Sequence, residues 1–252
     1  MSFDVAADAY DRFMGRWSRL IAPAMADLAP VGPADRVLDV GCGPGALTAE
    51  LVARIGPAAV AAVDPSEPFV AAVRAGLPGG DARVASAAEL PFEDAAFRAT
   101  LAQLVVHFMA DPVGGIAEMA RVTAPGGTCV ASVWDFAGRN DPLGPFWEAA
   151  RSLDPGAPGE AVLPGARQGH LVELFGAAGL RDVRETTLVA SRTFASFDEW
   201  WAPFEIGAGA ARRYLASLGE EQRQAIRERC RSMLPEGGFE LTARAWAATG
   251  TV

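Results

Sequence analysis

The segment Val37–Thr48, VLDVGCGPGALT, constrains the fold of this chain more than any other stretch. It begins with a short apolar run, typical of a buried strand, and continues with three glycines at alternating positions. Glycines leave a turn without side chains, so that its backbone can lie directly against a ligand. From Thr48 onward the apolar residues have helical spacing. A strand, a glycine turn and a helix in this order predict the nucleotide-binding unit of a doubly wound α/β fold.

Two acidic residues help to distinguish between the cofactors that such a turn could bind. Asp39 lies two residues before Gly41, where a carboxylate would repel the pyrophosphate of NAD. S-Adenosylmethionine instead carries an ammonium and a sulfonium, which a carboxylate attracts. Asp64 closes the apolar run 58–63 and can accept the hydroxyls of a ribose, a role that NAD sites share. The glycine spacing fits both cofactors, and Asp39 favours S-adenosylmethionine.

Four further segments continue this pattern along the chain. They are AYDRFMGRWS at 9–18, AAELPFEDAAF at 87–97, HFMADP at 107–112 and EMARVTAPGGTCVASVW at 118–134. Together with the glycine turn they resemble the class I methyltransferases over residues 10–134, within the small-molecule branch that includes ubiquinone- and menaquinone-pathway enzymes. The resemblance implies methyl transfer from S-adenosylmethionine to a small molecule, with S-adenosylhomocysteine as the product.

Short apolar runs alternate with stretches of helical spacing, which predicts an α/β fold with a mostly parallel sheet and helices on both faces. Strands are expected at 37–40, 60–64, 82–85, 99–104, 128–134, 183–194 and 239–247. The resemblance implies a Rossmann-like sheet of seven strands whose last two form a hairpin. We expect a single methyltransferase domain over 1–252, composed of an N-terminal flap and helix at 1–30, a cofactor-binding core at 31–134, a loop or lid at 135–168, and C-terminal strands at 169–252 with a helical insertion at 197–234.

Composition restricts the partners of the chain. A formal net charge of -9 argues against a general affinity for nucleic acid, whose binding depends on phosphate contacts. No apolar run is long enough for a membrane span, and the first residues lack the pattern of a signal peptide, so we expect a cytoplasmic protein without membrane contact. Three cysteines without metal-site spacing favour reduced thiols and no metal site. No pattern predicts an oligomeric state.

The resemblance also implies where the cofactor is held. The backbone of the glycine turn packs against it, Asp39 lies near the methionine ammonium, Asp64 holds the ribose, and the two residues after Asp64 border the adenosine. The expected cofactor-binding residues are Tyr10, Arg16, Asp39, Gly41, Cys42, Gly43, Asp64, Pro65, Ser66, Ser86, Ala87, Ala88, Gln103 and Leu104.

Some of these positions carry alternatives. Tyr10 and Arg16 could bind the methionine carboxylate from an N-terminal flap, or serve as a packing anchor and a surface charge. Relatives commonly have an aspartate where this chain has Ser86, whose hydroxyl can still accept from adenine but without charge assistance. Backbone groups of Ala87 and Ala88 then gain importance. Arg98 also replaces an aspartate that is common in relatives.

The sequence gives fewer constraints on the residues that contact the methyl acceptor. His107 follows the fourth expected strand and is the candidate general base, with a pocket-lining or structural histidine as the alternative. Trp134 and Asp135, just past the fifth strand, are placed to meet an acceptor. Trp200 and Trp201 could form an aromatic wall or anchor a helix to the core.

An arginine set near the C-terminus allows two interpretations, a basic patch for an anionic substrate or a solvated helix face with mixed-sign pairs, and interleaved glutamates favour the second. Its members are Arg212, Arg213, Arg223, Arg227, Arg229 and Arg231. The leading hypothesis is a methyltransferase that acts mainly by positioning a small acceptor for in-line displacement. The alternatives are a non-catalytic module that binds an adenosyl ligand and an NAD-dependent oxidoreductase.

Overall fold

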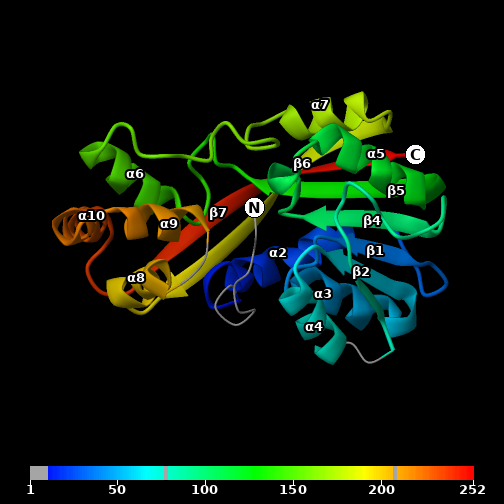
Figure 1. Cartoon of the computed structure of the whole chain (residues 1–252), viewed down its shortest axis with the longest axis horizontal. Helices are drawn as coiled ribbons and strands as arrows, with labels where there is room; N and C mark the ends of the chain where they lie inside the picture. Colours follow the sequence, from blue (N-terminus) through cyan, green and yellow to red (C-terminus); the bar gives the residue numbers. More distant parts are fainter. Residues whose placement is uncertain (1–10, 77–78, 207–208) are drawn as a thin grey trace.

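A computed structural model describes residues 11–76, 79–206 and 209–252, and all of its named strands belong to one sheet. The strand order is β3-β2-β1-β4-β5-β7-β6, with parallel pairing from β3 to β5 and antiparallel pairing of β7 with both of its neighbours (Figure 1). The strands are β1 (Val37–Val40), β2 (Val60–Asp64), β3 (Asp81–Val84), β4 (Phe97–Gln103), β5 (Thr123–Trp134), β6 (Arg181–Phe194) and β7 (Phe239–Thr251). The predicted seven-stranded, mostly parallel sheet is confirmed.

Helices cover the sheet and also form a separate group beyond it. The helical elements are η1 (Asp11–Gly15), α2 (Arg16–Asp27), α3 (Ala46–Ile55), η2 (Pro57–Ala59), α4 (Glu67–Gly76), η3 (Val106–Phe108), α5 (Pro112–Val122), α6 (Gly144–Leu153), α7 (His170–Ala177), α8 (Phe197–Ile206), α9 (Ala210–Ser217) and α10 (Glu220–Met233). Helices α2 and α3 contact each other, as do α5 and α7. Figure 1 shows α6, α8, α9 and α10 gathered at one end, away from α3 and α4.

The core strands follow directly from the apolar runs in the sequence. Every residue of β1 and β2 is buried, which is typical of parallel strands covered on both faces. Strand β5 begins earlier than expected, at Thr123, because Thr123 pairs with Phe97 before a register shift. The Gly126 N–H then donates to the Val252 carbonyl, which ties this irregular start to the end of the chain.

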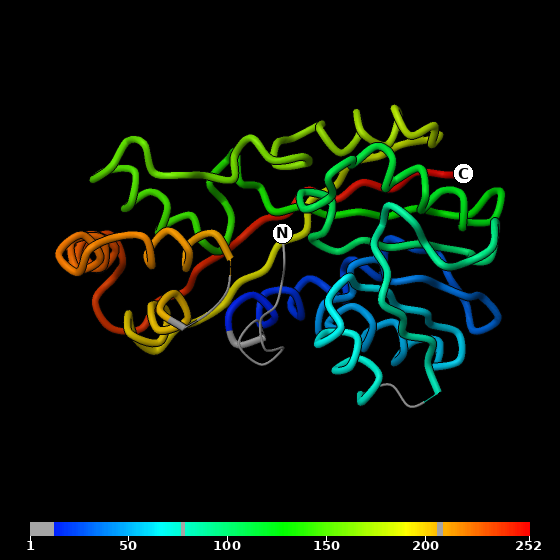
Figure 2. Tube along the Cα trace, in the orientation of Figure 1, coloured from blue at the N-terminus to red at the C-terminus, as the bar shows by residue number. Residues whose placement is uncertain are grey.

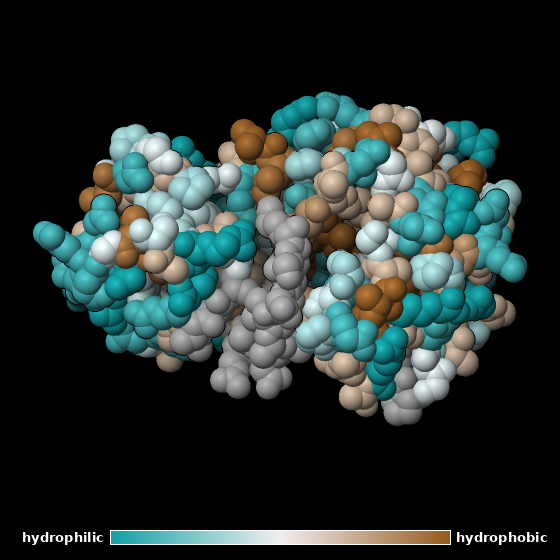
Figure 3. All heavy atoms as spheres, in the orientation of Figure 1, coloured by the Kyte–Doolittle hydropathy of each residue, from teal (hydrophilic) through white to brown (hydrophobic). Residues whose placement is uncertain are grey.

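The last two strands are long and carry the helical insertion between them. Figure 2 shows β6 and β7 extending from the sheet toward the group of α6 and α8–α10. Helix α10 packs against α6, so the insertion and the residues after β5 form one helical end. Its surface is mostly hydrophilic in Figure 3. No helix in the described part of the chain is long and apolar enough to cross a membrane.

Candidate functional site

The glycine turn between β1 and α3 is held against β2. The N–H groups of Gly41 and Cys42 both donate to the Val63 carbonyl, at 2.8 and 2.9 Å. Gly41 has a φ of +71°, and a Cβ on it would lie 2.5 Å from a methyl carbon of Val105. Gly43 has a φ of +53°, and a Cβ there would meet nothing within 4 Å. Gly41 is therefore required for packing, whereas Gly43 leaves open space beside the turn.

Asp39 and Asp64 frame this turn from the ends of their strands. Asp39 is 1% exposed and accepts a 2.6 Å hydrogen bond from the Thr48 hydroxyl. Burial raises the pKa of Asp39 to about 7, and the charge of Asp64 adds to the rise, although the Thr48 hydrogen bond opposes it. Asp64 accepts from the N–H groups of Gly43 and Ser66, at 2.9 and 2.8 Å, and burial raises its pKa as well. Both carboxylates lie where a cationic ligand would be stabilised.

A narrow cleft opens beside the turn, and we call it the glycine-turn cleft. It is lined by Gly15, Ser18, Asp39, Gly41, Cys42, Gly43, Pro44, Ala46, Leu47 and Gln103. Its volume is about 30 Å³, close to the share of one water molecule in the liquid.

Gln103 connects the end of β4 to α2 inside this cleft. Its side-chain N–H donates to the Ser18 carbonyl at 3.0 Å, and its buried Oε1 has no partner among the described residues. A buried carbonyl without a donor is costly, so this atom offers an acceptor to a ligand. The sequence indicated Gln103 and the segment 9–18, but it did not single out Gly15 or Ser18 within that segment, because helix packing places them in the cleft.

Arg16 is directed elsewhere, and Tyr10 lies outside the described residues. Residues 15 and 18 share one face of a helical segment, whereas residue 16 is turned by about a quarter of a circle from residue 15. Arg16 accordingly lines a different hollow, together with Phe194 and Trp200. Arg16 does not line the glycine-turn cleft in this conformation, and its pairing with a carboxylate of the cofactor stays a prediction.

The positions expected to border the adenosine lie near β2 and β3, and all of them except the buried Ser66 and the half-buried Ala87 are exposed. Pro65, Ser86 and Ala88 are exposed, and Ala87 is half-buried. The Ser86 hydroxyl accepts from the Ala88 N–H at 3.3 Å, so it is already engaged locally. None of these residues lines the glycine-turn cleft in this conformation.

Arg98, the second residue that departs from the pattern of the relatives, has a structural role in the sheet. Its guanidinium donates to the Gly126 carbonyl at 2.5 Å, which joins the start of β4 to the turn before the main ladder of β5. Arg98 therefore supports the sheet at the amino ends of these parallel strands, and the glycine turn lies at their carboxyl ends. Its replacement of an aspartate does not alter the cleft.

A larger, mostly apolar hollow lies next to the cleft, and we call it the aromatic cavity. Its volume is about 200 Å³, and its walls are Phe13, Met14, Leu104, His107, Phe108, Trp134, Phe136, Leu143, Gly159, Glu160, Leu163, Gly209, Ala210 and Arg213. They come from η1, the ends of β4 and β5, the loop after α6, and α9 with the glycine before it. Leu104 has a φ of +61°, the kind of strained backbone that clusters at functional sites.

Two polar groups in the aromatic cavity lack partners within the described residues. His107 is 6% exposed, its Nδ1 is unpaired, and its ring lies 3.9 Å from that of Phe108, centroid to centroid. Burial lowers the pKa of His107 to about 3, so the imidazole is neutral near pH 7. Trp134 is 2% exposed, and its indole N–H is also unpaired. Both residues line the cavity, and each carries a buried polar atom without a partner among the described residues.

The cavity also includes a charged pair that sequence reasoning missed as a site feature. Glu160 accepts from the Trp147 indole N–H at 3.2 Å. Burial raises the pKa of Glu160, and the positive charge of Arg213 opposes the rise. Glu160 lies in the stretch expected to be a lid, where glycine and proline spacing predicts a loop but not which side chain points inward.

Asp135 does not fit the expected contact with an acceptor. It is 2% exposed and accepts hydrogen bonds from Arg244, at 2.7 Å, and from the Trp246 indole, at 3.0 Å. It also accepts from the Asn140 side chain and the Gly138 N–H. Because these bonds occupy the carboxylate and it lines neither hollow, Asp135 holds β5, β7 and the following turn together.

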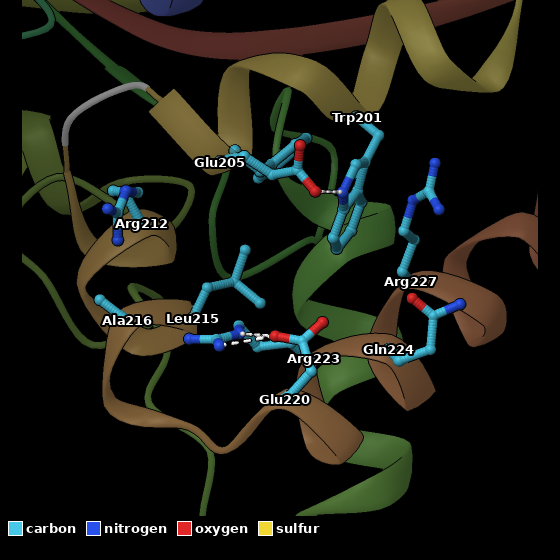
Figure 4. Close-up of a pocket in the computed structure, with 10 residues that line it drawn as sticks. Trp201, Glu205, Arg212, Leu215, Ala216, Glu220, Arg223, Gln224 and Arg227 are labelled. Carbon is cyan, nitrogen blue, oxygen red and sulfur yellow. Dashed lines mark hydrogen bonds and ion pairs between the residues drawn. The ribbon is translucent and has the colours of Figure 1, made fainter.

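Trp200 and Trp201 also lie outside the aromatic cavity. Both are buried in an aromatic cluster that includes Phe204, with ring centroids 4.8 and 5.6 Å away, respectively. Trp201 donates to Glu205 at 2.8 Å and faces a separate hollow inside the insertion (Figure 4). This packing favours the second interpretation of these two residues, as anchors of α8 to the core, and their place in an acceptor wall stays a prediction. The aromatic cavity itself is lined by Phe13, Phe108 and Phe136.

Comparisons with known proteins agree with this geometry. Residues 38–131 match the family model described as a methyltransferase domain. An uncharacterized methyltransferase of Mycobacterium tuberculosis is 39% identical over 144 residues, which is 57% of this chain and 55% of that protein. A demethylmenaquinone methyltransferase of a Mycobacterium species is 39% identical over 121 residues, 48% of this chain and 47% of the relative. The chain spans about half the length of the curated relatives it matches.

The fold extends the similarity beyond the matched segment. A solved structure from Thermotoga maritima, described as a SAM-dependent methyltransferase and possible histamine N-methyltransferase, has a TM-score of 0.57. The match covers 97% of this chain and 96% of that one, at 17% sequence identity. At this identity the likeness establishes the fold, including the part after β5 that the family model does not match.

Proposed function

We propose that the protein transfers a methyl group from S-adenosylmethionine to a small, largely apolar acceptor, on the premise that residues 38–131 match the family model of a methyltransferase domain. One observation carries this proposal. Gln103 and Leu104 are adjacent at the end of β4, yet Gln103 lines the glycine-turn cleft and Leu104 lines the aromatic cavity. A charged cofactor hollow and an apolar acceptor hollow thus meet at one point of the backbone.

The residues of the cleft fit S-adenosylmethionine, which when bound supplies a methyl group activated by its attachment to a sulfonium. Asp39, with Thr48 fixing its orientation, would hold the ammonium of the methionine part. Asp64 would accept the ribose hydroxyls, and the open side of Gly43 would allow the backbone to approach the ligand. The unpaired Oε1 of Gln103 would accept one further hydrogen bond.

The aromatic cavity would act mainly by positioning the acceptor and excluding water. Orientation of two reactants in a dry site can remove several kcal/mol from a barrier without any acid or base. For an acceptor that loses a proton, His107 is the imidazole that lines the cavity, and proton transfer to it would have to overcome the burial that lowers its pKa to about 3. The other role open to His107 is purely structural, as part of the ring packing with Phe108 and Phe136.

Binding of the cofactor tests the proposal first. S-Adenosylhomocysteine should raise the unfolding temperature of the full chain, by an amount that grows with the logarithm of its concentration over its dissociation constant, and NAD should leave it unchanged. Incubation with S-adenosylmethionine labelled in the methyl group, together with a panel of small phenols, amines and activated carbon acids, should then give a labelled product. Stabilisation by NAD instead would overturn the proposal. Binding of S-adenosylhomocysteine, without transfer of the labelled methyl group to any compound of the panel or of a cell extract, would favour a non-catalytic module.

A further inference from the structure

One carboxylate lies in the otherwise mostly apolar wall of the aromatic cavity. Among the described residues that line this cavity, Glu160 is the only acidic one, and His107 and Arg213 are the others with ionisable side chains. Glu160 comes from the loop after α6 and is half-buried. Small-molecule sites are mainly apolar, and their few polar groups fix the orientation of the ligand. Glu160 is therefore placed to decide which molecules the cavity holds.

The backbone and the side chain of Glu160 are both held in place. Its carbonyl accepts from the Leu163 N–H at 3.1 Å, and Leu163 also lines the cavity. Its carboxylate oxygen Oε2 accepts from the Trp147 indole N–H at 3.2 Å. Trp147 is 2% exposed and packs against Phe146 and Tyr214, with ring centroids 5.0 and 5.8 Å away. The indole is thus a fixed donor that orients the carboxylate from outside the cavity, which Trp147 does not line.

The second carboxylate oxygen of Glu160 is unused. Oε1 accepts no hydrogen bond from any residue in the described part of the chain. It is also not enclosed by protein atoms, whereas Nδ1 of His107 and the indole nitrogen of Trp134 are. A ligand can therefore reach Oε1. Because an ionised carboxylate only accepts hydrogen bonds, a molecule at this oxygen has to present a donor.

The surrounding charges limit the charge that such a molecule can carry. Burial raises the pKa of Glu160, and the Trp147 hydrogen bond and the positive charge of Arg213 oppose the rise and so favour the carboxylate. Arg213 lines the same cavity and would repel an ammonium. A further negative charge is disfavoured too, because the charge of Glu160 already adds to the raised pKa of the buried Asp141. A neutral hydroxyl or N–H group avoids both penalties.

We propose that Glu160 selects the methyl acceptor, a selection that rests on the proposed function, in which the aromatic cavity holds that molecule. The acceptor is a neutral, apolar molecule that donates a hydrogen bond from a hydroxyl or N–H group to Oε1. Its apolar body lies against Phe13, Phe108 and Phe136. Glu160 fixes the orientation of the acceptor, and no bond to the carboxylate forms or breaks. A compound without the donor leaves Oε1 unpaired in the cavity and is rejected for that reason.

Binding of indole and benzofuran tests this selection without any turnover. The two molecules are nearly the same shape, and only indole has an N–H donor. In isothermal titration of the full chain, indole should bind at least about tenfold more tightly than benzofuran, because benzofuran leaves the carboxylate oxygen unpaired. Equal affinities would overturn the proposal, and so would absence of saturable indole binding. The titrations are run with and without S-adenosylhomocysteine, whose own failure to bind would count against the proposed methyl transfer and not against the preference for indole.

Glu160→Gln should reverse the preference of the cavity. The Trp147 N–H still needs an acceptor, so the new amide oxygen turns toward it and the NH₂ group faces the cavity. Indole should then bind about tenfold or more weakly than in the unaltered protein, and quinoline, whose ring nitrogen only accepts, should bind more tightly. A purely structural role of Glu160 predicts that indole, benzofuran and quinoline weaken alike. That outcome would overturn the proposal.

Glu205→Gln is the matched control. Glu205 also accepts an indole N–H, that of Trp201 at 2.8 Å, but it lines the separate hollow inside the insertion (Figure 4). Its substitution should change indole affinity by less than about twofold. If Glu205→Gln abolishes the preference for indole while Glu160→Gln keeps it, indole binds inside the insertion and the proposal is wrong. Unchanged unfolding temperatures establish that both variants are folded.

Discussion

The glycine-turn cleft and the aromatic cavity lie side by side but are built in opposite ways. The cleft is formed mostly by one continuous turn and its flanking strand and helix, and the polar side chains that line it include the buried Asp39 and Gln103. The cavity is assembled from segments between Phe13 and Arg213, and its walls are mainly aromatic and aliphatic side chains. The cleft is thus defined by buried polar groups and by the backbone of the turn, whereas the cavity is defined by the shape of its apolar walls.

This difference teaches where change is tolerated. The turn is limited by backbone geometry, because Gly41 has no room for a Cβ and has a positive φ. The cavity is limited only by the volume that its side chains leave, and loops and α9 provide much of that volume. Substitution within the cavity is therefore expected to alter acceptor choice, and substitution in the cleft to alter cofactor binding.

His107→Ala should have the largest effect and should separate the two hollows most sharply. If His107 takes a proton from the acceptor, turnover falls by about 10²–10⁴-fold while affinity for S-adenosylhomocysteine is unchanged. Steady-state kinetics and calorimetry on the same preparation measure both. His170→Ala is the matched control, because His170 accepts from the Gly165 N–H and lines neither hollow. Equal losses of turnover and cofactor affinity would assign His107 a structural role.

Asp135→Ala should reduce stability without selectively affecting either hollow. The substitution leaves Arg244 and the Trp246 indole without their acceptor, so we expect the free energy of unfolding to fall by about 2–4 kcal/mol in urea titrations. Asp94→Ala removes an exposed carboxylate that pairs with Arg121, and it should cost less than about 1 kcal/mol. If the Asp135→Ala protein is stable and its KM for the acceptor is altered, Asp135 contacts the acceptor as the sequence predicted.

Asp64→Ala should weaken cofactor binding by about 1–3 kcal/mol, the cost of losing hydrogen bonds to a charged group. Calorimetry with S-adenosylhomocysteine measures it. Asp81→Ala, at the start of β3, removes a carboxylate that pairs with Arg83 outside the cleft and serves as the control. Unchanged affinity in Asp64→Ala would remove Asp64 from the cofactor site.

The pH dependence of cofactor binding tests the other carboxylate. Asp39 has a raised pKa of about 7, so it is protonated in a growing share of the ligand-free protein as the pH falls below 7. Because only the ionised form pairs with an ammonium, affinity for S-adenosylhomocysteine should be lost as the pH falls, by up to roughly tenfold per unit. His107, with a pKa of about 3, does not titrate between pH 5.5 and 7. Asp39→Asn should flatten the profile, and a slope unchanged in that variant would assign it to another group.

Arg16→Gln should have the smallest effect. Because Arg16 lines a hollow with Phe194 and Trp200, away from the glycine turn, cofactor affinity should change by less than about twofold in calorimetry. A tenfold loss would instead show that the N-terminal helices rearrange on binding and carry Arg16 over the cofactor. That result would add Arg16 to the residues that bind the cofactor.

The sequence specified the cofactor half well because its determinants are local. The apolar run that becomes β1, the glycines and the acidic residues at the strand ends are read from a few adjacent positions, and β1 and β2 have the predicted bounds. Parallel strands place their carboxyl ends at one edge, so Asp39, Asp64 and Gln103 could be grouped before any contact was known. The helical insertion was also predictable, because hydrophobic spacing and the expected final hairpin bracket it.

Tertiary structure alone decided which side chains form the aromatic cavity and which merely support it. Asp135 and Trp134 are neighbours that the sequence marks equally as acceptor contacts. Asp135 is occupied by Arg244 and Trp246, whereas Trp134 lines the cavity. Trp201 was directed into the insertion by the packing of α8. The glycine turn carries its ligand geometry in its own backbone, whereas the cavity depends on contacts between residues far apart in the chain, which no local pattern encodes.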